Sequence, residues 1–237
     1  MKKITSILIL ILVMFQTVAF AYSDVSDAGL TSKLDELSKY NIINGYQDGT
    51  FKPNNNITRA EFSKMVMVAT MNDYVDVDSS QFVDVTPGFW AEKYIYAAKT
   101  LGVVNGTTET TFAPEANITN EQAVKMIVAS LGYNEEAVEA GGYPNGYIKV
   151  AGELGIIDLN NFDGSKVSTR KEIAEMVYNS MNIKFYFLYL DENGNIMRSE
   201  AENTLKEIHE ISVDNAIDLD VIPDERQDED KVVEDVG

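Results

Sequence analysis

The sequence predicts a mainly α-helical protein that contains three copies of one helix–loop–helix unit. The first observation is an internal repeat. Shifting the 237-residue chain by 61 residues brings these pairs into register without a gap: Asn44-Gly45 on Asn105-Gly106, Phe51 on Phe112, Pro53 on Pro114, and Ile57-Thr58 on Ile118-Thr119. A repeat of this kind indicates units that bury their apolar faces against one another.

A shorter third copy is the second observation. At a shift of 53 residues, Tyr143 falls on Trp90, and Leu154-Gly155 falls on Leu101-Gly102. We therefore assign repeat 1 to residues 22–80, repeat 2 to residues 81–140 and a diverged repeat 3 to residues 141–183.

The start of the chain has the layout of a secretory signal peptide. Lys2 and Lys3 precede the apolar stretch Ile4 to Phe20, and Ala19-Phe20-Ala21 forms a small-x-small cleavage signal. We expect residues 1–21 to be removed. The alternative is an uncleaved membrane anchor, because the stretch is almost long enough to span a bilayer. After cleavage, no membrane contact is expected.

Composition limits the function. The chain has no cysteine and a net charge of -19. Without disulfides, an exported protein must rely on a hydrophobic core. The negative charge repels nucleic acid and anionic lipid, so neither is an expected partner.

Each repeat is expected to begin with an amphipathic helix that ends near Asn-Gly or Leu-Gly. A turn follows, "NGYQDGTFKP" in repeat 1, where Gly45 and Gly49 suit a left-handed backbone. Phe51 and Phe112 are expected to anchor the loops in the core. In the second helix Met65, Met126 and Met176 take equivalent positions, and this spacing favours core packing over a ligand site.

The second helix of each repeat begins at a capping box, in which a threonine and a residue three positions later bond each other's backbone N–H groups. The three boxes are Thr58 with Glu61, Thr119 with Gln122, and Thr169 with Glu172.

The cap does not explain the residue after the threonine. Arg59 and Arg170 place a cation where the helix dipole disfavours one. One explanation is a salt bridge to a neighbouring repeat, from Asp24 or Asp84. The other is an anion site, in which the guanidinium and unpaired N–H groups of the helix start bind a carboxylate. Repeat 2 has Asn120 instead, so its site should be weaker.

The order "FVDVTPGFWAEKYI", "IINGYQDGTFKP" and "ITRAEF" resembles the S-layer homology (SLH) repeat of Gram-positive bacterial surface proteins. The resemblance implies a pseudo-threefold spindle, with a central three-helix bundle and three loop prongs. It also implies binding of a secondary cell wall polymer, often pyruvylated, between the prongs. The implied polymer contacts are Arg59, Arg170, Gly45, Tyr46, Asp48, Gly49, Trp90, Asn120 and Tyr143.

The repeats depart from this pattern in ways that predict one or two working sites. Repeat 1 has Gly29 or Leu30 in place of Trp90, repeat 2 lacks the arginine and the Gly-Tyr-x-Asp-Gly loop, and repeat 3 lacks that loop. Trp90 could equally be a half-buried core residue, and Asp48 is better explained as a turn residue.

After the repeats, "KFYFLYLDENGNIMR" predicts a β-hairpin and "SEAENTLKEIHEI" a helix, within an extension at residues 184–222. Asp191, Asn193, Asn195 and Glu202 have calcium-loop spacing, but Ile196 stands where that loop needs glycine, so no metal is expected. His209 is expected on the surface, and residues 223–237 as an acidic disordered tail.

These observations predict a noncatalytic, secreted protein of the cell wall or S-layer, attached through an anionic secondary wall polysaccharide. An anchor remnant or shortened relative of a larger S-layer protein or wall enzyme is the alternative. No catalytic motif is present, and neither an enzymatic cofactor nor a metal is expected.

Overall fold

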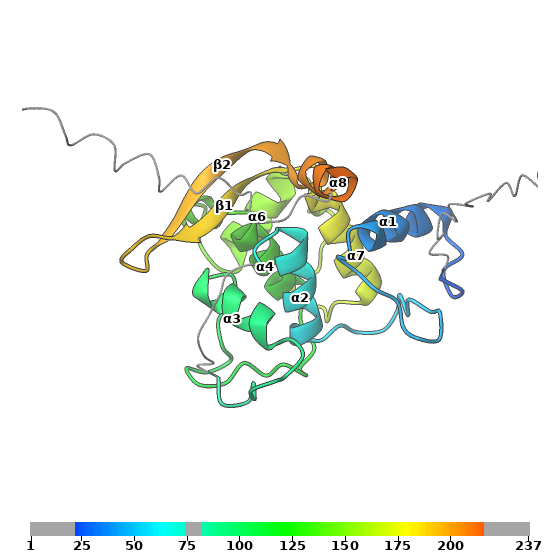
Figure 1. Ribbon diagram of the computed structural model, residues 1–237, viewed down its shortest axis with the longest axis horizontal. Coiled ribbons are helices and arrows are strands. Elements are labelled where there is room, and N and C mark those ends of the chain that lie inside the picture. Colours follow the sequence, from blue (N-terminus) through cyan, green and yellow to red (C-terminus); the bar gives the residue numbers. More distant parts are fainter. Residues whose placement is uncertain (1–21, 74–81, 216–237) are drawn as a thin grey trace, which may run out of the picture.

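The computed structural model describes residues 22–73 and 82–215. The expected signal peptide, the expected disordered tail and the end of repeat 1 therefore lie outside the described residues. The described part is mainly helical, with one small antiparallel hairpin near its C-terminal end (Figure 1), as the sequence predicted.

Each repeat contributes two main helices. The first helices are α1 (Ala28–Lys39), α3 (Glu92–Thr100) and α6 (Asn145–Glu153), and the second helices are α2 (Arg59–Ala69), α4 (Asn120–Ser130) and α7 (Arg170–Ser180). The sequence did not predict the short helix α5 (Asn134–Glu139), which connects repeats 2 and 3. Helix α1 also ends earlier than expected, at Lys39, and the segment up to Asn44-Gly45 is non-helical.

The helices close into a ring. The second helices α2, α4 and α7 contact one another at the centre, and each first helix packs on the second helix of the preceding repeat: α3 on α2, α6 on α4, and α1 on α7 (Figure 1). The last of these contacts joins repeat 1 to repeat 3. The architecture is thus a pseudo-threefold bundle.

Three backbone hydrogen bonds mark the centre of this ring. Ile57 N donates to Ser168 O (3.4 Å), Ser168 N donates to Ile118 O (2.9 Å), and Ile118 N donates to Ile57 O (3.2 Å). Each residue directly precedes the N-cap threonine of its repeat. The repeated phrase therefore joins the three repeats as well as starting three helices.

The core is aromatic at the loops and aliphatic between the helices. Phe51 and Phe112 are fully buried, and the rings of Tyr22 and Phe82 pack against them with centroids 5.4 and 5.5 Å apart. The methionine row is buried, as expected for core residues. Burial of each such side chain stabilises the fold by about 1.5–3 kcal/mol.

The C-terminal extension consists of β1 (Lys184–Leu190), β2 (Ile196–Thr204) and α8 (Leu205–Asn215). The helix expected from Ser199 begins only at Leu205, because residues before it pair with β1, as Tyr186 does with Glu200. A fourth capping box starts α8: Thr204 N donates to Glu207 Oε2 (2.8 Å), and Glu207 N donates to Thr204 Oγ1 (3.3 Å).

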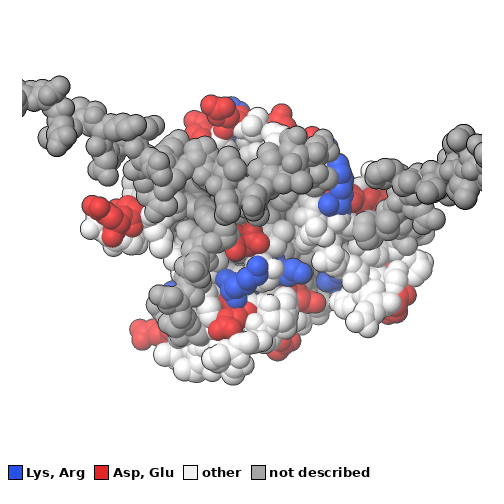
Figure 2. All heavy atoms as spheres, in the orientation of Figure 1, with Lys and Arg blue, Asp and Glu red and all other residues white. Residues whose placement is uncertain are grey.

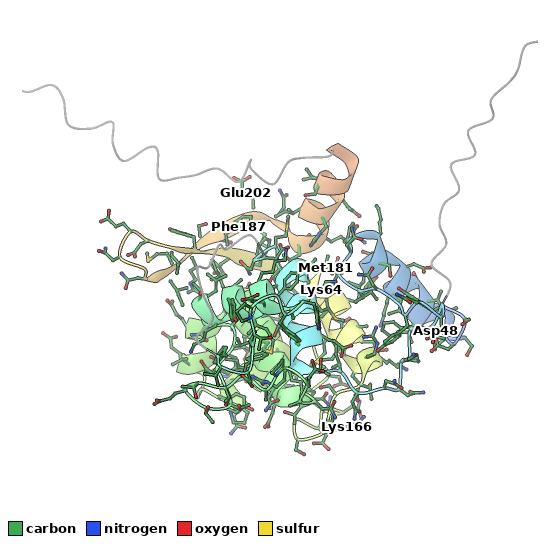
Figure 3. The ribbon with its side chains drawn as sticks, turned by 60° about the horizontal axis from the view of Figure 1, so that its bottom comes forward. Asp48, Lys64, Lys166, Met181, Phe187 and Glu202 are labelled. Carbon is green, nitrogen blue, oxygen red and sulfur yellow. The ribbon has the colours of Figure 1, made fainter. Side chains whose placement is uncertain are left out.

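The extension covers the C-terminal ends of the central helices, where backbone carbonyls lack helical partners. Tyr186 N donates to Leu131 O after α4 (3.0 Å), and Lys206 N donates to Met181 O after α7 (2.8 Å). Figure 3 shows Met181 at this end of the bundle, below the strand that carries Phe187. The extension therefore packs as part of the same folded body.

His209 completes this cover, so its expected surface position is wrong. The side chain is 7% exposed, its Nε2–H donates to Ala69 O at the end of α2 (3.0 Å), and its ring packs on Tyr40. Burial lowers the pKa of His209, which favours the neutral ring.

The turn with calcium-loop spacing, which begins at Asp191, is stabilised by hydrogen bonds to the Asp191 side chain. Asp191 Oδ1 accepts hydrogen bonds from Asn193 N (2.9 Å) and Asn195 N (2.7 Å). Within residues 22–73 and 82–215, no group of three or more acidic or histidine side chains is arranged to hold a metal ion.

Candidate functional site

Arg59 and Arg170 are the first residues of α2 and α7, and both side chains point into the protein. They are only 8% and 5% exposed. Arg59 Nε donates to Phe112 O (2.9 Å) and Nη2 to Asn105 O (3.0 Å), so a repeat 1 side chain holds the repeat 2 loop. The arginine therefore has a structural role that the sequence did not reveal.

Arg170 makes the same contacts one step around the ring. Its Nε donates to Phe51 O (2.8 Å) and its Nη2 to Asn44 O (3.1 Å), so repeat 3 holds the loop of repeat 1. Asn120 takes this position in repeat 2, and its Nδ2 donates to Asp163 O of repeat 3 (3.0 Å).

The proposed salt bridges to Asp24 and Asp84 are absent among the described residues, because both carboxylates bind loop backbone instead. Asp24 accepts hydrogen bonds from the N–H groups of Phe51 and Lys52, both at 2.8 Å. Asp84 does the same for Phe112 (2.8 Å) and Ala113 (2.7 Å). Lys52 and Ala113 have left-handed backbones, with φ of 57° and 58°, and these bonds hold them there.

The two arginines differ in the negative charges that lie near them. Arg170 Nη1 lies 3.9 Å from Glu61 Oε1. Among the described residues Arg59 has no carboxylate within ion-pair distance, and its two bonds go to neutral carbonyls. Burial lowers the pKa of Arg59, and the negative charge of Asp84 opposes this shift. The Arg59 guanidinium is thus a buried cation without a direct counter-ion.

The second half of the anion-site hypothesis, unpaired N–H groups at the helix start, is wrong. Arg59 N donates to Ala116 O (2.9 Å) and Ala60 N to Pro114 O (3.0 Å), and the corresponding groups of the other second helices also donate to an adjoining repeat. Because these groups are already paired, the helix starts offer no backbone donor to an anion.

The capping boxes differ in the hydrogen bonds that they form. Glu61 N donates to Thr58 Oγ1 (3.2 Å) and Thr58 N to Glu61 Oε2 (2.9 Å), and Thr169 with Glu172 repeats this pattern. In repeat 2, Thr119 N donates to Gln122 Oε1 (3.2 Å), but the Thr119 hydroxyl has no hydrogen-bond partner among the described residues.

The glycine-rich loop of repeat 1 is a tight turn. Tyr46 N donates to Thr50 O (2.8 Å), and Gly49 has φ of +76°, as expected for a left-handed residue. Gly45 does not have the expected left-handed backbone. It is needed for space, because an added Cβ would lie 2.2 Å from the Tyr22 ring and 2.9 Å from Thr50 O.

Two side chains of this loop differ in role. Tyr46 is half-buried, and its ring faces Lys52 Nζ at 4.0 Å and Arg170 Cζ at 4.9 Å from the centroid. Asp48 accepts a hydrogen bond from Thr50 N (3.1 Å) and pairs with Lys52 (3.3 Å), which stabilises the turn. Figure 3 shows Asp48 and Lys166 at separate extremities of the molecule, on the loops of repeats 1 and 3.

Asn120 is turned inward. It is 5% exposed, and its Oδ1 accepts a hydrogen bond from Ser168 Oγ (2.6 Å) in addition to the bond that its Nδ2 donates. Both polar atoms thus bond protein groups, which makes it the poorest ligand contact of the set.

Trp90 and Tyr143 are exposed aromatic side chains, at 53% and 52%. The Trp90 ring packs against Phe89, with centroids 5.6 Å apart and the planes tilted by 45°, and Trp90 is not a core residue. The Tyr143 hydroxyl donates to Glu121 Oε1 (3.1 Å), and burial together with Glu121 raises the pKa of Tyr143 to about 12. The positive charge of Arg59 opposes this shift, so Arg59 acts electrostatically on Tyr143.

Sequence reasoning missed Lys125 of α4. Its Nζ donates to Gly102 O (2.8 Å) and Val103 O (2.7 Å), and the charge of Arg59 acts on it. The only sequence signal was a lysine at the same place in repeats 1 and 2, Lys64 and Lys125. Figure 2 shows Lys and Arg side chains gathered across the middle of the viewed face, while Asp and Glu are spread widely.

Comparison with known proteins finds a match to the repeat. Residues 21–63 and 81–124, which lie almost wholly in the first two copies, match the S-layer homology domain.

Several curated relatives are surface proteins. The "Middle cell wall protein" of Brevibacillus brevis is 29% identical over 160 residues, covering 66% of this chain and 15% of that protein. The "Cellulosome-anchoring protein" of Acetivibrio thermocellus is 31% identical over 119 residues, covering 48% of this chain and 26% of that protein. An "Endoglucanase" of a Bacillus species is 34% identical over 123 residues, covering 49% of this chain and 12% of that protein.

The chain thus spans at most about a quarter of these three relatives. The repeats and the relatives together indicate a cell-surface protein of a Gram-positive-type bacterium. In the part of the chain that the structure describes, no helix has the length and apolar character needed to cross a bilayer.

Proposed function

We propose that this protein attaches noncatalytically to the cell wall by binding an anionic, pyruvylated secondary wall polysaccharide. We also propose that residues 141–183 are a diverged third S-layer homology repeat. Helices α6 and α7 take the same place in the ring as the helices of the two matched repeats, which supports the assignment.

The observation that carries the proposal is that the Arg59 guanidinium is buried and has no ion-pair partner among the described residues; Asp84 acts on it only from beyond ion-pair distance. A buried cation without a counter-ion is unfavourable, because burial removes water and supplies no opposite charge. A carboxylate of the polymer would supply that charge. Among the described residues Arg59 Nη1 has no hydrogen-bond partner, whereas Nε and Nη2 are both occupied. The ligand would therefore meet one edge of the guanidinium.

Exposed aromatic rings complete the proposed site. Tyr143 is within the electrostatic range of Arg59 and presents half of its surface to solvent. Aromatic faces pack well against the apolar faces of sugar rings, so Tyr143 suits the saccharide next to the acidic group. Trp90 and Tyr46 would contact saccharides in the same way at other positions around the ring of helices.

The three equivalent positions should then differ in strength. At Arg170 the nearby Glu61 already offers a negative charge, so an anionic ligand gains less there. At Asn120 no cation is present, and the amide is engaged internally. The Arg59 position should contribute most of the binding.

An enzymatic role is the second candidate, because an endoglucanase is among the relatives that share these repeats. The described residues form one body made of the repeats and their extension, which favours the anchoring role for this part of the chain.

The test is binding of labelled protein to purified Gram-positive cell walls, with and without their secondary polymer. We expect binding only when the polymer is present. We also expect Arg59→Met to weaken it at least tenfold and Arg170→Met to weaken it less. Because both arginines hold loops, the melting temperature of each variant must be compared with that of wild type.

Arg198→Met is the matched control, since Arg198 pairs with Glu135 and Glu136 on α5 at 2.8 Å and lies away from the arginine positions. Binding that survives removal of the polymer, or that the folded Arg59 variant retains in full, contradicts the proposal. Release of sugars from the walls would support the enzymatic candidate instead.

A further inference from the structure

Lys125 and Arg59 hold the same loop from two central helices. Lys125, on α4, donates to the carbonyls of Gly102 and Val103, where helix α3 ends and the loop of repeat 2 begins. Arg59, on α2, donates to the carbonyls of Asn105 and Phe112 further along this loop. Two cations thus fix one loop, and both are largely withdrawn from water.

The charges that shift the pKa of Lys125 are positive. Burial, then Lys99 on α3, then Arg59 on α2 lower the pKa of Lys125 to about 8. Among the described residues, neither Lys125 nor Arg59 forms an ion pair with a carboxylate. Glu121, one turn earlier on α4, accepts the Tyr143 hydroxyl bond. In a chain of net charge -19, a group of cations without counter-ions is unusual.

We infer that Lys125 is a second determinant of anion binding at the Arg59 position: its ammonium fixes the loop and adds a titratable positive charge to the site. This inference rests on the proposed function. It specifies that an anionic saccharide binds more weakly at alkaline pH, because Lys125 loses its charge there while Arg59 keeps its own.

The direction of this pH dependence follows from the groups present. Lys125 carries its charge below about pH 8 and loses it above. Arg59 remains charged throughout, the Tyr143 hydroxyl stays protonated because its pKa is raised, and a carboxylate ligand stays ionised. Affinity should therefore fall between pH 7 and pH 9.

The repeats supply a matched control. Lys64 in repeat 1 and Glu175 in repeat 3 occupy the positions equivalent to Lys125. Lys64 lies on α2 (Figure 3), and among the described residues it forms no hydrogen bond with the loop of repeat 2 that Lys125 holds. Replacing Lys64 thus removes the same charge from the molecule without removing it from this loop.

The experiment measures binding of polymer-bearing cell walls, and of a small pyruvate-ketal hexoside as probe, at pH 7 and pH 9. For wild type and Lys64→Met we expect affinity to fall about three- to tenfold over this range, a tenfold change corresponding to one pKa unit. Lys125→Met should bind weakly at both values. Lys125→Arg should restore binding and remove the pH dependence.

Two failures can be told apart. If wild type does not bind the walls at pH 7, the proposed function itself is wrong. If wild type binds but is insensitive to pH, or if Lys125→Met with an unchanged melting temperature binds as well as wild type, only the inference about Lys125 is wrong. A pH effect that Lys125→Arg retains would also overturn it.

Discussion

At the scale of single residues, the arginines show that a structural role and a predicted ligand-binding role can fall on the same side chain. A cation in the first turn of a helix opposes the helix dipole, and this conflict pointed to an external ligand. The structure shows that Arg59 also bonds two carbonyls of the next repeat, which the sequence could not reveal because the partners lie 46 and 53 residues away. Its ligand role stays a prediction.

Gly45 offers a residue-scale prediction. Gly45→Ala should destabilise the protein by about 1–3 kcal/mol, because the new methyl group would overlap the Tyr22 ring and approach Thr50 O. Chemical denaturation measures the effect as a shift in midpoint.

Gly49→Ala is the comparison. There the backbone is left-handed but nothing lies within 4 Å of the added Cβ, so we expect a smaller loss of about 1 kcal/mol. Equal losses at the two positions would contradict the steric explanation for Gly45.

At the scale of elements, the sequence was most informative where local signals repeat. The capping threonines, the buried methionine row and the C-terminal hairpin were all visible in the sequence, because helix starts and strand turns depend on neighbouring residues. The start of α8 was misplaced: the stretch before Leu205 contains good helix formers, but pairing with β1 makes it a strand. The box Thr204-x-x-Glu207 would have given the correct start.

The capping boxes give a second prediction. Thr58→Ala and Thr169→Ala should each lower the free energy of unfolding by about 1 kcal/mol, since each removes an oxygen that accepts a helix N–H. Thr119→Ala should have a smaller effect, because that hydroxyl makes no hydrogen bond with the described residues. Urea denaturation of the three variants tests the order, and a loss at Thr119 equal to the others would contradict it.

Helix α8 gives a third prediction, based on His209. The pKa of His209 is lowered in the folded protein, mainly by burial, so the unfolded chain binds a proton more readily. By linkage, the stability that neutral His209 contributes is present above about pH 6.5 and is lost as the pH falls through the lower folded pKa.

The measurement is the melting temperature of wild type and His209→Gln at pH 7 and pH 5. Carboxylates will shift both proteins, so the difference between them is the informative quantity. We expect wild type to lose more stability than the variant on acidification. Parallel shifts would mean that His209 does not titrate differently on folding.

At the scale of the whole molecule, the order of the repeats in space could not be read from their order in the chain. Spacing showed three similar units, and only the resemblance to the S-layer homology repeat implied a spindle. The reason is that closure depends on contacts between residues far apart, such as those of Arg170 with Asn44 and Phe51. The sequence also did not show that the extension covers the bundle. This cover depends on hydrogen bonds from the extension to carbonyl groups at the ends of helices in all three repeats, which lie far apart in the chain.

Closure gives a fourth prediction. Because each repeat contacts both others, the described body should unfold in one transition. Trp90 is the single tryptophan of the chain, so its fluorescence reports on repeat 2 alone, while far-ultraviolet circular dichroism reports on all helices. The two unfolding curves should coincide. Separate midpoints would show that the repeats unfold as independent units, as in an open array.

The ring of hydrogen bonds through Ile57, Ile118 and Ser168 also restricts how such a protein can change its length. An open solenoid gains or loses a unit at an end and leaves the remaining interfaces intact. Here a fourth unit would have to be inserted between two bonded neighbours, and every crossing angle would change. Adding or removing a single repeat would therefore break the closed ring of hydrogen bonds, whereas substitutions within the three repeats leave it intact.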